Sequence, residues 1–320
     1  MVTRRGRGSG STQRWPAASR YANPGLVLAT QTFIVWQMID EILSTVTEAP
    51  VSYLIYSAMS FYGDRRGGEL SGTWFVAALE SLGVAAAAAR QTLFRMERDE
   101  ELVGRKVGRV KLYRALPYAR AEIGAGVQKI FTTADAEWDG YWTLVLTQFP
   151  NDMRLERERV RNILQVEGFA PLGNGAYVHA RDRAERLRAA LADLGVGRFV
   201  TAFRADRVHG MSDREFALAH WDLDALGREY IEFVDRFEPL AARSARSFAR
   251  QAQFALRFAV VLGFLEVAWK DPELPLSMLP ARWPGARART LARRLYERFL
   301  PGALAFGDEL AARTSVPVFR

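Results

Sequence analysis

The stretch that most constrains the fold is residues 51–114, in which three helical patterns are followed by a short basic hairpin pattern. In the third helical pattern, Ala89, Leu93 and Met96 gather on one side of a helix that turns by about 100° per residue. The opposite side carries, within an arc of about 140°, Arg90, Gln91, Arg95 and Arg98. A helix with one buried face and one face of arginine and glutamine suits insertion into the DNA major groove. The pattern therefore predicts a winged helix-turn-helix over residues 49–115.

Glycine, serine and threonine mark the joins between these elements. The first helix is predicted to end at Gly63, and Thr73 is predicted to cap the second helix. Residues 81–83 supply a tight turn before the third helix. Residues 65–68 combine two arginines with two glycines. This loop suits either the grip of a backbone phosphate or simple exposure to solvent.

Residues 102–114 alternate as a hairpin with its turn at Val107 and Gly108. Such a wing places four basic side chains along the DNA backbone or in the minor groove: Arg105, Lys106, Arg109 and Lys111. A charged, exposed hairpin would show the same pattern by itself, but the preceding helices favour DNA binding. Phe94 lies at the edge of the arginine face and suits two roles, packing under the wing or contact with a thymine methyl group.

The length, net charge and residue composition of the chain limit the classes of partner that it can bind. A chain of 320 residues is long enough for two or three domains. Its net charge of +8 and pI near 10.0 favour polyanionic partners such as nucleic acid or a CoA-type ligand. The absence of cysteine excludes disulfides and Cys-ligated zinc, and it favours a reducing cytoplasm. The three histidines lack metal-ligand spacing, so neither a metal nor a cofactor is expected.

The N-terminal residues divide into two segments. Residues 1–25 contain five arginines and no acid, which predicts a disordered basic tail. That tail suits either additional phosphate contacts or no function. Residues 26–39 are apolar but shorter than the roughly 20 residues of a membrane span, and no signal cleavage site follows them. Residues 26–48 are therefore predicted to form a helical extension, with its helix over residues 30–47.

Two further domains are predicted beyond a connecting helix over residues 116–137. Residues 138–208 show the order β-α-β-β-α-β of a ferredoxin-like unit, with helices capped by Asn151 and Asp182. Residues 209–320 are predicted to be helical, with a last helix over residues 286–299. The apolar run at residues 259–264 is short and flanked by charge, so it predicts a buried core helix and no membrane span. The fold class is α+β.

Four segments between about residues 45 and 310 carry a family resemblance. They are FYGDRRGGELSGTWFVAALESLG, RQTLFRMERDEEL with its basic hairpin, WDGYW, and KDPELPLSMLPARWPG. Together they resemble the phenylacetate-degradation repressor (PaaX) family. The resemblance implies a homodimeric repressor with a winged helix, a middle domain like CRISPR-associated ribonucleases and a helical C-terminal part.

The resemblance also implies a ligand and a set of DNA contacts. Such repressors block operons for aromatic-acid catabolism until an aryl-CoA thioester, typically phenylacetyl-CoA, binds. The family motif places four residues in the recognition helix: Arg90, Gln91, Thr92 and Arg95. It places the four basic residues of the hairpin in the wing.

An aryl-CoA ligand needs cations for its phosphates and an apolar slot for its acyl group. The motifs and this chemistry suggest five candidates: Trp138, Trp142, Trp221, Lys270 and Trp283. For each of them, an ordinary core aromatic residue or a surface lysine is the alternative.

Two other functions fit parts of the pattern. A ferredoxin-like middle domain resembles a metal-dependent nuclease, with Asp152 as a possible metal ligand. The alternative for Asp152 is a residue at a helix start, where an acid favours the helix dipole. A winged helix that contacts protein in place of DNA would make the chain an adaptor, with a weak salt dependence of DNA association.

Overall fold

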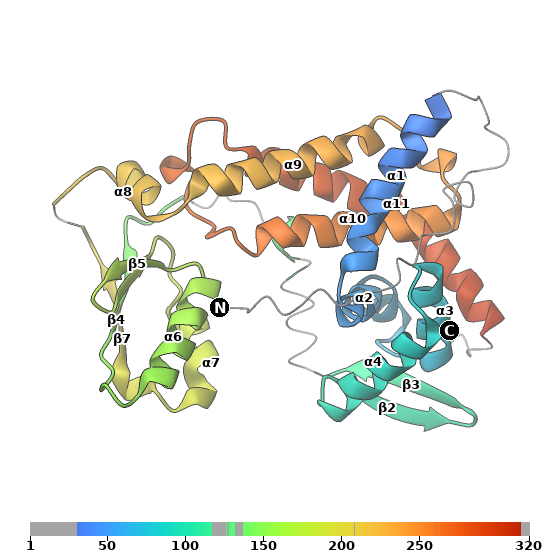
Figure 1. Ribbon diagram of the computed structural model, residues 1–320, viewed down its shortest axis with the longest axis horizontal. Helices are drawn as coiled ribbons and strands as arrows, with labels where there is room; N and C mark the ends of the chain where they lie inside the picture. Colours follow the sequence, from blue (N-terminus) through green and yellow to red (C-terminus); the bar gives the residue numbers. More distant parts are fainter. Residues whose placement is uncertain (1–30, 117–125, 127, 132–136, 208, 315–320) are drawn as a thin grey trace. The chain divides into compact units, whose positions relative to one another are not determined.

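The computed structural model describes residues 31–116, 126, 128–131, 137–207 and 209–314 (Figure 1). The predicted tail of residues 1–25 and most of the predicted connecting helix lie outside the described residues. Helices and antiparallel sheets are both present, which confirms the α+β class. Internal contacts divide the chain into two units. Unit 1 comprises Met1–Ala125, Leu240–Leu262 and Leu295–Arg320, and unit 2 comprises Gly126–Pro239 and Gly263–Arg294.

Unit 1 begins with helices and continues with a mixture of helices and short strands. Its elements are α1 (Gln31–Glu48), α2 (Val51–Ala58), a π-helical turn η2 (Met59–Gly63), a 3-10 turn η3 (Asp64–Arg66), β1 (Leu70–Ser71), α3 (Gly72–Ser81), α4 (Ala86–Arg98), β2 (Leu102–Val107) and β3 (Val110–Ala115). The helix predicted over residues 30–47 is confirmed as α1. Its residues Ile39, Ile42, Leu43 and Val46 are buried at helical spacing, so α1 is held by one apolar face.

The basic hairpin is formed as predicted. Strands β2 and β3 pair without a bulge from Leu102 opposite Ala115 to Val107 opposite Val110. The short β1 extends the sheet to the order β1-β3-β2. Gly108 has φ of 59° at the turn, a left-handed conformation that glycine adopts without a steric cost.

The cap of α3 differs from the predicted one. Ser71 caps the helix, because its Oγ accepts a hydrogen bond from the backbone N–H of Trp74 at 3.0 Å. Thr73 lies inside the first turn, and its hydroxyl contacts the Ser71 hydroxyl at 3.0 Å. A cap accepts from the N–H of the second or third helical residue, so the earlier start of the helix moves the role to Ser71.

Two long C-terminal helices, α10 (Arg250–Ala268) and α11 (Pro284–Arg313), contribute residues to unit 1. The predicted end of the last helix at Phe299 is wrong, because α11 continues through Pro301 for three further turns. The buried side chains of α11 continue at helical spacing across the proline: Leu295, Phe299, Ala303, Phe306 and Leu310. Burial of this seam outweighs the hydrogen bond that a proline removes.

Helix α10 is long and apolar enough to cross a membrane, alone among the described helices, and 78% of its most apolar window is buried inside the protein. Core helices of soluble proteins pass the same test of length and composition. The burial agrees with the core helix that the sequence predicts.

Unit 2 contains the predicted order β-α-β-β-α-β. The elements are β4 (Trp142–Thr147), α6 (Arg154–Val166), β5 (Ala170–Gly173), β6 (Ala176–His179), α7 (Ala184–Leu191), the 3-10 turns η4 (Ala192–Leu194) and η5 (Gly197–Phe199), and β7 (Val200–Ala205). The strands form one antiparallel sheet in the order β5-β6-β4-β7. The core between this sheet and its two helices includes Val145, Val160, Leu164, Phe169, Leu187 and Leu191.

The two predicted caps in this part differ in outcome. Helix α6 begins at Arg154 without a side-chain cap, so the prediction for Asn151 is wrong. The turn before α6 delays its start by three residues beyond Asn151. At α7, the Asp182 carboxylate accepts a hydrogen bond from the N–H of Ala184 at 3.0 Å, although Arg183 holds the cap position.

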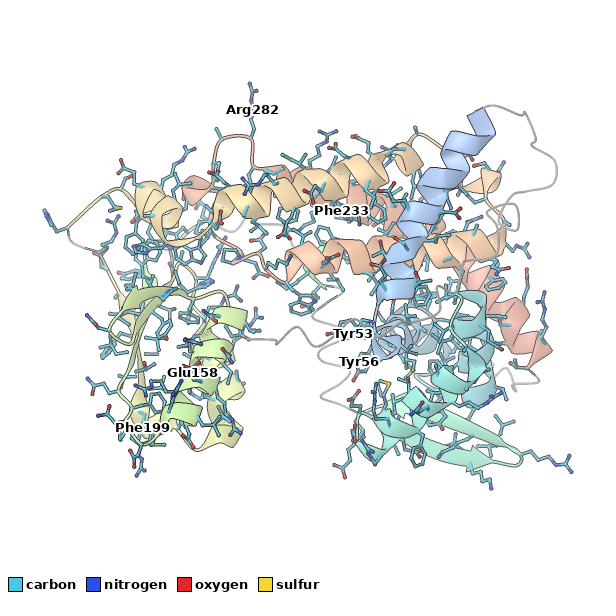
Figure 2. The ribbon with its side chains drawn as sticks, viewed as in Figure 1. Tyr53, Tyr56, Glu158, Phe199, Phe233 and Arg282 are labelled. Atoms are coloured by element: carbon cyan, nitrogen blue, oxygen red, sulfur yellow. The ribbon has the colours of Figure 1, made fainter. Side chains whose placement is uncertain are left out.

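Helices of the C-terminal part also belong to unit 2. They are α8 (Asp213–His220), most of α9 (Leu223–Ala241), a 3-10 turn η7 (Leu276–Met278), and the parts of α10 and α11 that fall within Gly263–Arg294. A capping box between Ser212 and Glu215 starts α8. Phe233 of α9 packs edge-on against Phe264 of α10 at 5.6 Å between ring centroids (Figure 2).

Candidate nucleic-acid interface and effector site

Helix α4 presents the predicted polar face to solvent. The exposed side chains on this face are Arg90, Gln91, Phe94, Arg95 and Arg98. Ala89, Leu93 and Met96 are each at most 2% exposed and hold the opposite face of the helix in the core. The division follows from the helical repeat, because the buried residues recur every three or four positions.

Thr92 is absent from the exposed face. It lies one turn after Ala89 and one turn before Met96, and only 8% of its surface is exposed. The same helical repeat that exposes Arg95 therefore turns Thr92 into the core. Its family-derived place in the recognition helix does not make it available for a base contact.

Three of the basic candidates are held by acids. Two of them belong to the hairpin and form ion pairs with acids outside it. Lys111 Nζ lies 2.6 Å from the Glu97 carboxylate, and the Arg105 guanidinium lies 2.6 Å from the Glu69 carboxylate. Arg98 pairs with the neighbouring Asp99 at 2.8 Å. The hydrogen bond to Glu97 raises the pKa of Lys111. The basic side chain of each pair is exposed, so the main effect of the pairs is on side-chain position, with little on stability.

The remaining candidates carry no such partner. These exposed residues are Arg90, Gln91 and Arg95 on α4, with Lys106 and Arg109 beside the hairpin turn. No hydrogen bond or ion pair joins their side chains to another described residue. Four cations and one amide are thus available to an external anion, and a helix face with an adjacent hairpin carries them.

A second group of motif residues holds η2 and α3 to α11 within unit 1. The Tyr62 ring stacks on Trp74 at 4.8 Å with an interplanar angle of 3°. The Tyr62 hydroxyl donates to Asp308 at 2.8 Å, and the Trp74 indole N–H donates to the Gly307 carbonyl oxygen at 2.9 Å. Burial and the Asp308 carboxylate raise the pKa of Tyr62.

Arg66 of the basic loop also pairs with Asp308. The side chain of Arg66 is exposed, as one of the two interpretations of the loop expects, but its ion pair with Asp308 was not predicted. Sequence reasoning missed this junction because Asp308 lies 242 residues away from Arg66. The signal was present in FYGDRRGG and SGTWF, whose aromatic residues turn out to be packing residues.

Arg257 of α10 forms another internal contact of unit 1. Its guanidinium lies over the rings of Phe61, at 5.0 Å, and Tyr296, at 3.4 Å, and it donates to the Tyr296 carbonyl oxygen. The residue is 1% exposed, and burial lowers the pKa of Arg257 to about 10. Aromatic faces therefore stabilise this buried cation.

Four of the five effector candidates come together in unit 2. Trp142 is in the centre, with ring-centroid distances of 5.4 Å to Trp138 and 6.4 Å to Trp221. Trp283 packs against the same cluster from the loop before α11. The apolar members of the cluster come from the sheet, α8 and the segment around η7: Ala170, Val178, Ala217, Leu274, Met278 and Leu279.

The indole groups of this aromatic cluster differ in their hydrogen bonds. Trp138 donates to the Tyr141 carbonyl at 3.1 Å, and Trp221 donates to the Gly168 carbonyl at 2.9 Å. The Trp142 N–H is buried and finds no acceptor among the described residues. Buried donors are nearly always satisfied, so an acceptor for this N–H is expected from beyond the described residues.

The fifth candidate, Lys270, is not a member of the cluster. Its Nζ pairs with Glu229 of α9 at 2.6 Å and its side chain is half exposed. The next residue, Asp271, accepts a hydrogen bond from Tyr230 at 2.7 Å, and the Tyr230 ring lies 5.8 Å from that of Trp283. Lys270 thus lies in the segment that borders the cluster.

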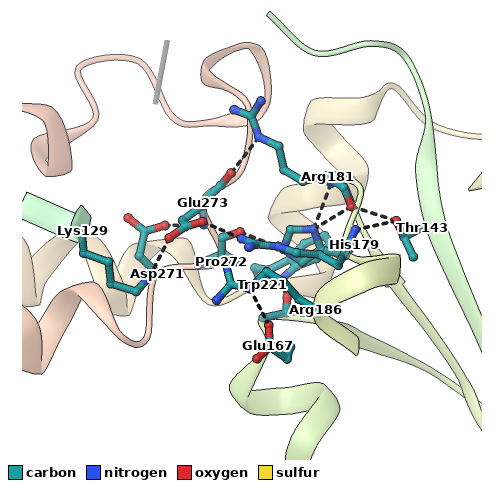
Figure 3. A network of polar contacts seen from close by, with 12 residues as sticks. Lys129, Thr143, Glu167, His179, Arg181, Arg186, Trp221, Asp271, Pro272 and Glu273 are labelled. Carbon is teal, nitrogen blue, oxygen red and sulfur yellow. Dashed lines mark hydrogen bonds and ion pairs between the residues drawn. The ribbon is translucent and has the colours of Figure 1, made fainter. Parts of the chain in front are cut away.

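A polar network in the same unit was missed from the sequence (Figure 3). The buried His179 accepts at Nδ1 from the Arg181 backbone N–H, which leaves Nε2 to donate to the Pro272 carbonyl oxygen at 2.9 Å. Burial and the Arg183 charge lower the pKa of His179 to about 3. The imidazole is therefore neutral and joins strand β6 to the KDPELP segment.

Glu273 completes this network. Its carboxylate bridges Lys129 and Arg183, each at 2.6 Å. Burial raises the pKa of Glu273, but the two cations outweigh burial and lower it to about 2. The KDPELP motif was the signal, and its acid proves to anchor the loop that borders the aromatic cluster.

Asp152, the candidate metal ligand, is exposed before α6. Within the described residues, no group of three or more histidine, aspartate or glutamate side chains is arranged to hold a metal ion.

Comparisons with known proteins extend these observations. The model of the PaaX protein central Cas2-like domain matches residues 135–217, and that of the PaaX-like protein C-terminal domain matches residues 221–309. The chain is 29% identical over 259 residues to the transcriptional repressor PaaX of Escherichia coli K12, covering 78% of this chain and 81% of that protein. A solved structure, the uncharacterized protein Rv0674 from Mycobacterium tuberculosis, is 20% identical with a TM-score of 0.48, covering 74% of this chain and 89% of the other. The two adjoining domain models include the aromatic cluster and the His179–Glu273 network, and the chain belongs to the PaaX-like family.

Proposed function

We propose that this protein is a DNA-binding transcriptional repressor of an aromatic-acid (phenylacetate-type) catabolic operon. An aryl-CoA thioester such as phenylacetyl-CoA releases it from its operator. It acts in the cytoplasm as a homodimer, with residues 49–115 as a winged helix-turn-helix. Residues 138–208 form the ferredoxin-like domain and residues 209–320 the helical domain of this repressor.

One observation carries the DNA-binding part. Arg90, Gln91 and Arg95 extend from the exposed face of α4, and no hydrogen bond or ion pair joins their side chains to another described residue, although the charge of Arg95 acts on Asp99. Arginine and glutamine are the side chains that recognise guanine and adenine edges in the major groove. The adjacent hairpin offers Lys106 and Arg109 to the phosphates. A related chain carries the name of a transcriptional repressor, which supports the same function here.

The test selects tight-binding duplexes from a random pool and compares them with unselected DNA. Wild-type protein is expected to prefer a near-palindrome whose half-sites are separated by about one helical turn or a multiple. Arg90→Ala and Arg95→Ala are each expected to cost about 1–3 kcal/mol on the selected duplex and little on random DNA. Glu158→Ala, in α6 outside the interface, is the control (Figure 2). Equal footprints for wild type and both arginine variants would show that α4 does not contact the bases.

Affinity measured against salt separates this function from that of an adaptor. Release of counterions from phosphates predicts a steep linear fall of log affinity with log salt concentration. A flat dependence would favour protein contacts by the winged helix and would count against the repressor.

The aromatic cluster supports the effector. Four tryptophans line an apolar region in which one buried N–H lacks an acceptor among the described residues. A thioester carbonyl supplies such an acceptor, and the tryptophan rings suit an aryl group. Lys270, in the segment that borders the cluster, would exchange its partner Glu229 for a phosphate of the CoA portion. The effector must bind one state of the dimer better than the other, because equal affinity would shift no equilibrium.

Calorimetry against a panel of acyl-CoA thioesters tests this part. Phenylacetyl-CoA is expected to bind more tightly than acetyl-CoA or free CoA, and to release the protein from the selected duplex. Trp142→Phe keeps an aromatic ring and removes the N–H, so it is expected to weaken binding by about 1–3 kcal/mol. Trp138→Phe is the matched control, since its N–H already donates to Tyr141. Binding that is unchanged in Trp142→Phe would move the effector site elsewhere.

A further inference from the structure

Phe94 is the one apolar side chain in the middle of the polar face of α4. It is 67% exposed, whereas Leu93 and Met96 of the same helix are buried. Arg90 and Gln91 precede it by one helical turn, and Arg98 follows it by one turn. An aromatic ring on such a face adds no packing to the core, and water contact with it is unfavourable.

The junction between α4 and the hairpin has no place for this ring. The sequence suits packing of Phe94 under the wing, but the exposure of the side chain rules out that role. The junction is filled by the pair of Glu97 and Lys111. That pair lies against Gly104 of β2 so closely that a Cβ there would overlap both side chains.

We propose that Phe94 contacts the 5-methyl group of a thymine in each half-site and so makes this protein selective for thymine at that position. The inference rests on the proposed binding of DNA by α4. In the major groove the 5-methyl group is the apolar feature of thymine, and phenylalanine is among the side chains that contact it. The contact removes both the ring and the methyl group from water.

The spacing along α4 locates the thymine. Phe94 lies four residues after Arg90, which corresponds to about 6 Å along the helix axis. DNA rises about 3.4 Å per base pair and the helix lies obliquely in the groove, so the thymine is expected within about two base pairs of the base that Arg90 contacts. Arg90 and Phe94 together would then read a guanine and a thymine at fixed separation.

Replacement of thymine by uracil tests the contact, because uracil pairs like thymine and lacks only the methyl group. The probe is the duplex selected from a random pool, resynthesised with deoxyuridine at one thymine position at a time. Wild-type protein is expected to bind about fourfold more weakly when the critical thymine of one half-site is replaced, the factor for one methyl-sized group. The variant Phe94→Ala is expected to bind the thymine and uracil duplexes equally.

Two control variants make the result specific. Arg98→Ala removes a neighbour of Phe94 on the same face; it is expected to keep the ratio of thymine to uracil affinity even where its total affinity for DNA falls. Tyr53→Ala removes an aromatic side chain of α2 that is similarly exposed, at 57%, and is expected to keep it too (Figure 2). Because Phe94 is exposed, Phe94→Ala is expected to unfold at the same temperature as wild type.

The possible outcomes separate this inference from the function on which it rests. A selected duplex that binds with a steep salt dependence, but tolerates uracil at every position, would overturn the role of Phe94 and leave the repressor standing. Equal uracil sensitivity in wild type and Phe94→Ala would overturn that role as well. A selection that returns no preferred sequence would overturn both.

Discussion

Trp74 in unit 1 and Trp142 in unit 2 are both buried in aromatic surroundings, with 1% and 3% of their surfaces exposed. The Trp74 N–H donates to the Gly307 carbonyl oxygen, while the Trp142 N–H meets no acceptor among the described residues. An unmade buried hydrogen bond costs about 1–3 kcal/mol. The made hydrogen bond contributes to the contact between α3 and α11, whereas the unmade one is the observation on which the proposed effector site around Trp142 rests.

The largest expected effect concerns His179, a buried donor of unit 2 that is satisfied. Its pKa is lowered to about 3 when folded, so the unfolded state takes up a proton first as pH falls below about 6.5. Stability is then fully present above pH 6.5 and is lost progressively towards pH 3, by an amount on the order of 5 kcal/mol. Denaturation curves recorded across this range measure the loss.

A variant separates His179 from other acid-sensitive groups. Glu273, with its pKa lowered to about 2, loses its contribution between about pH 4.5 and 2 in any variant that retains it. His179→Gln does not titrate, so its stability is expected to fall less between pH 6.5 and 4.5. Parallel curves for the two proteins would contradict the assignment of a neutral, buried imidazole.

The second prediction concerns a substitution that disrupts the packing of Tyr62 and Trp74 against α11 in unit 1. A Cβ at Gly307 would lie 2.6 Å from the Tyr62 ring, so Gly307→Ala is expected to displace the ring from Trp74. Overpacking of this kind costs about 1–3 kcal/mol, measured by chemical denaturation. Gly197→Ala, where no atom lies within 4 Å of the added carbon, is expected to be neutral. Equal free energies of unfolding for the two variants would show that the Tyr62 ring can move aside without loss of stability.

The third prediction concerns a substitution of Trp74 that removes its indole hydrogen bond but keeps an aromatic ring. Trp74→Phe removes the indole hydrogen bond to the Gly307 carbonyl oxygen and shrinks a buried side chain, and it is expected to cost about 2 kcal/mol. The expected signature is a lower denaturation midpoint with an unchanged denaturant slope.

The smallest expected effect on stability is the counterpart in unit 2. Trp142→Phe removes a donor that has no described acceptor, so the loss of apolar area is partly offset by relief of that donor. We expect a change below about 1 kcal/mol, smaller than that of Trp74→Phe. A larger loss for Trp142→Phe would indicate that its N–H already has a partner.

The local sequence pattern predicted the secondary structure well where the residues of a single helix or turn are enough to determine its conformation. The hairpin turn at Gly108 needs only a residue that tolerates positive φ, and the arginine face of α4 needs only the helical repeat. The prediction for α11 failed at Pro301 because burial of Phe306 and Leu310 beyond it depends on residues distant in the chain. The cap of α3 failed by two residues, since Ser71 and Thr73 are equally good caps by composition.

The candidate sites divide in the same way. The amino-acid sequence alone determined the net charge, the amphipathic pattern of α4, the basic hairpin and the family motifs, because each is a property of composition or of neighbours within a few residues. Packing between distant segments decided that Phe94 is exposed and Thr92 is not, and that Tyr62 and Trp74 hold α11. It also decided that the Trp142 N–H is left open in a cluster of tryptophans. Burial and hydrogen-bond closure depend on which segments meet, and no local pattern contains that information.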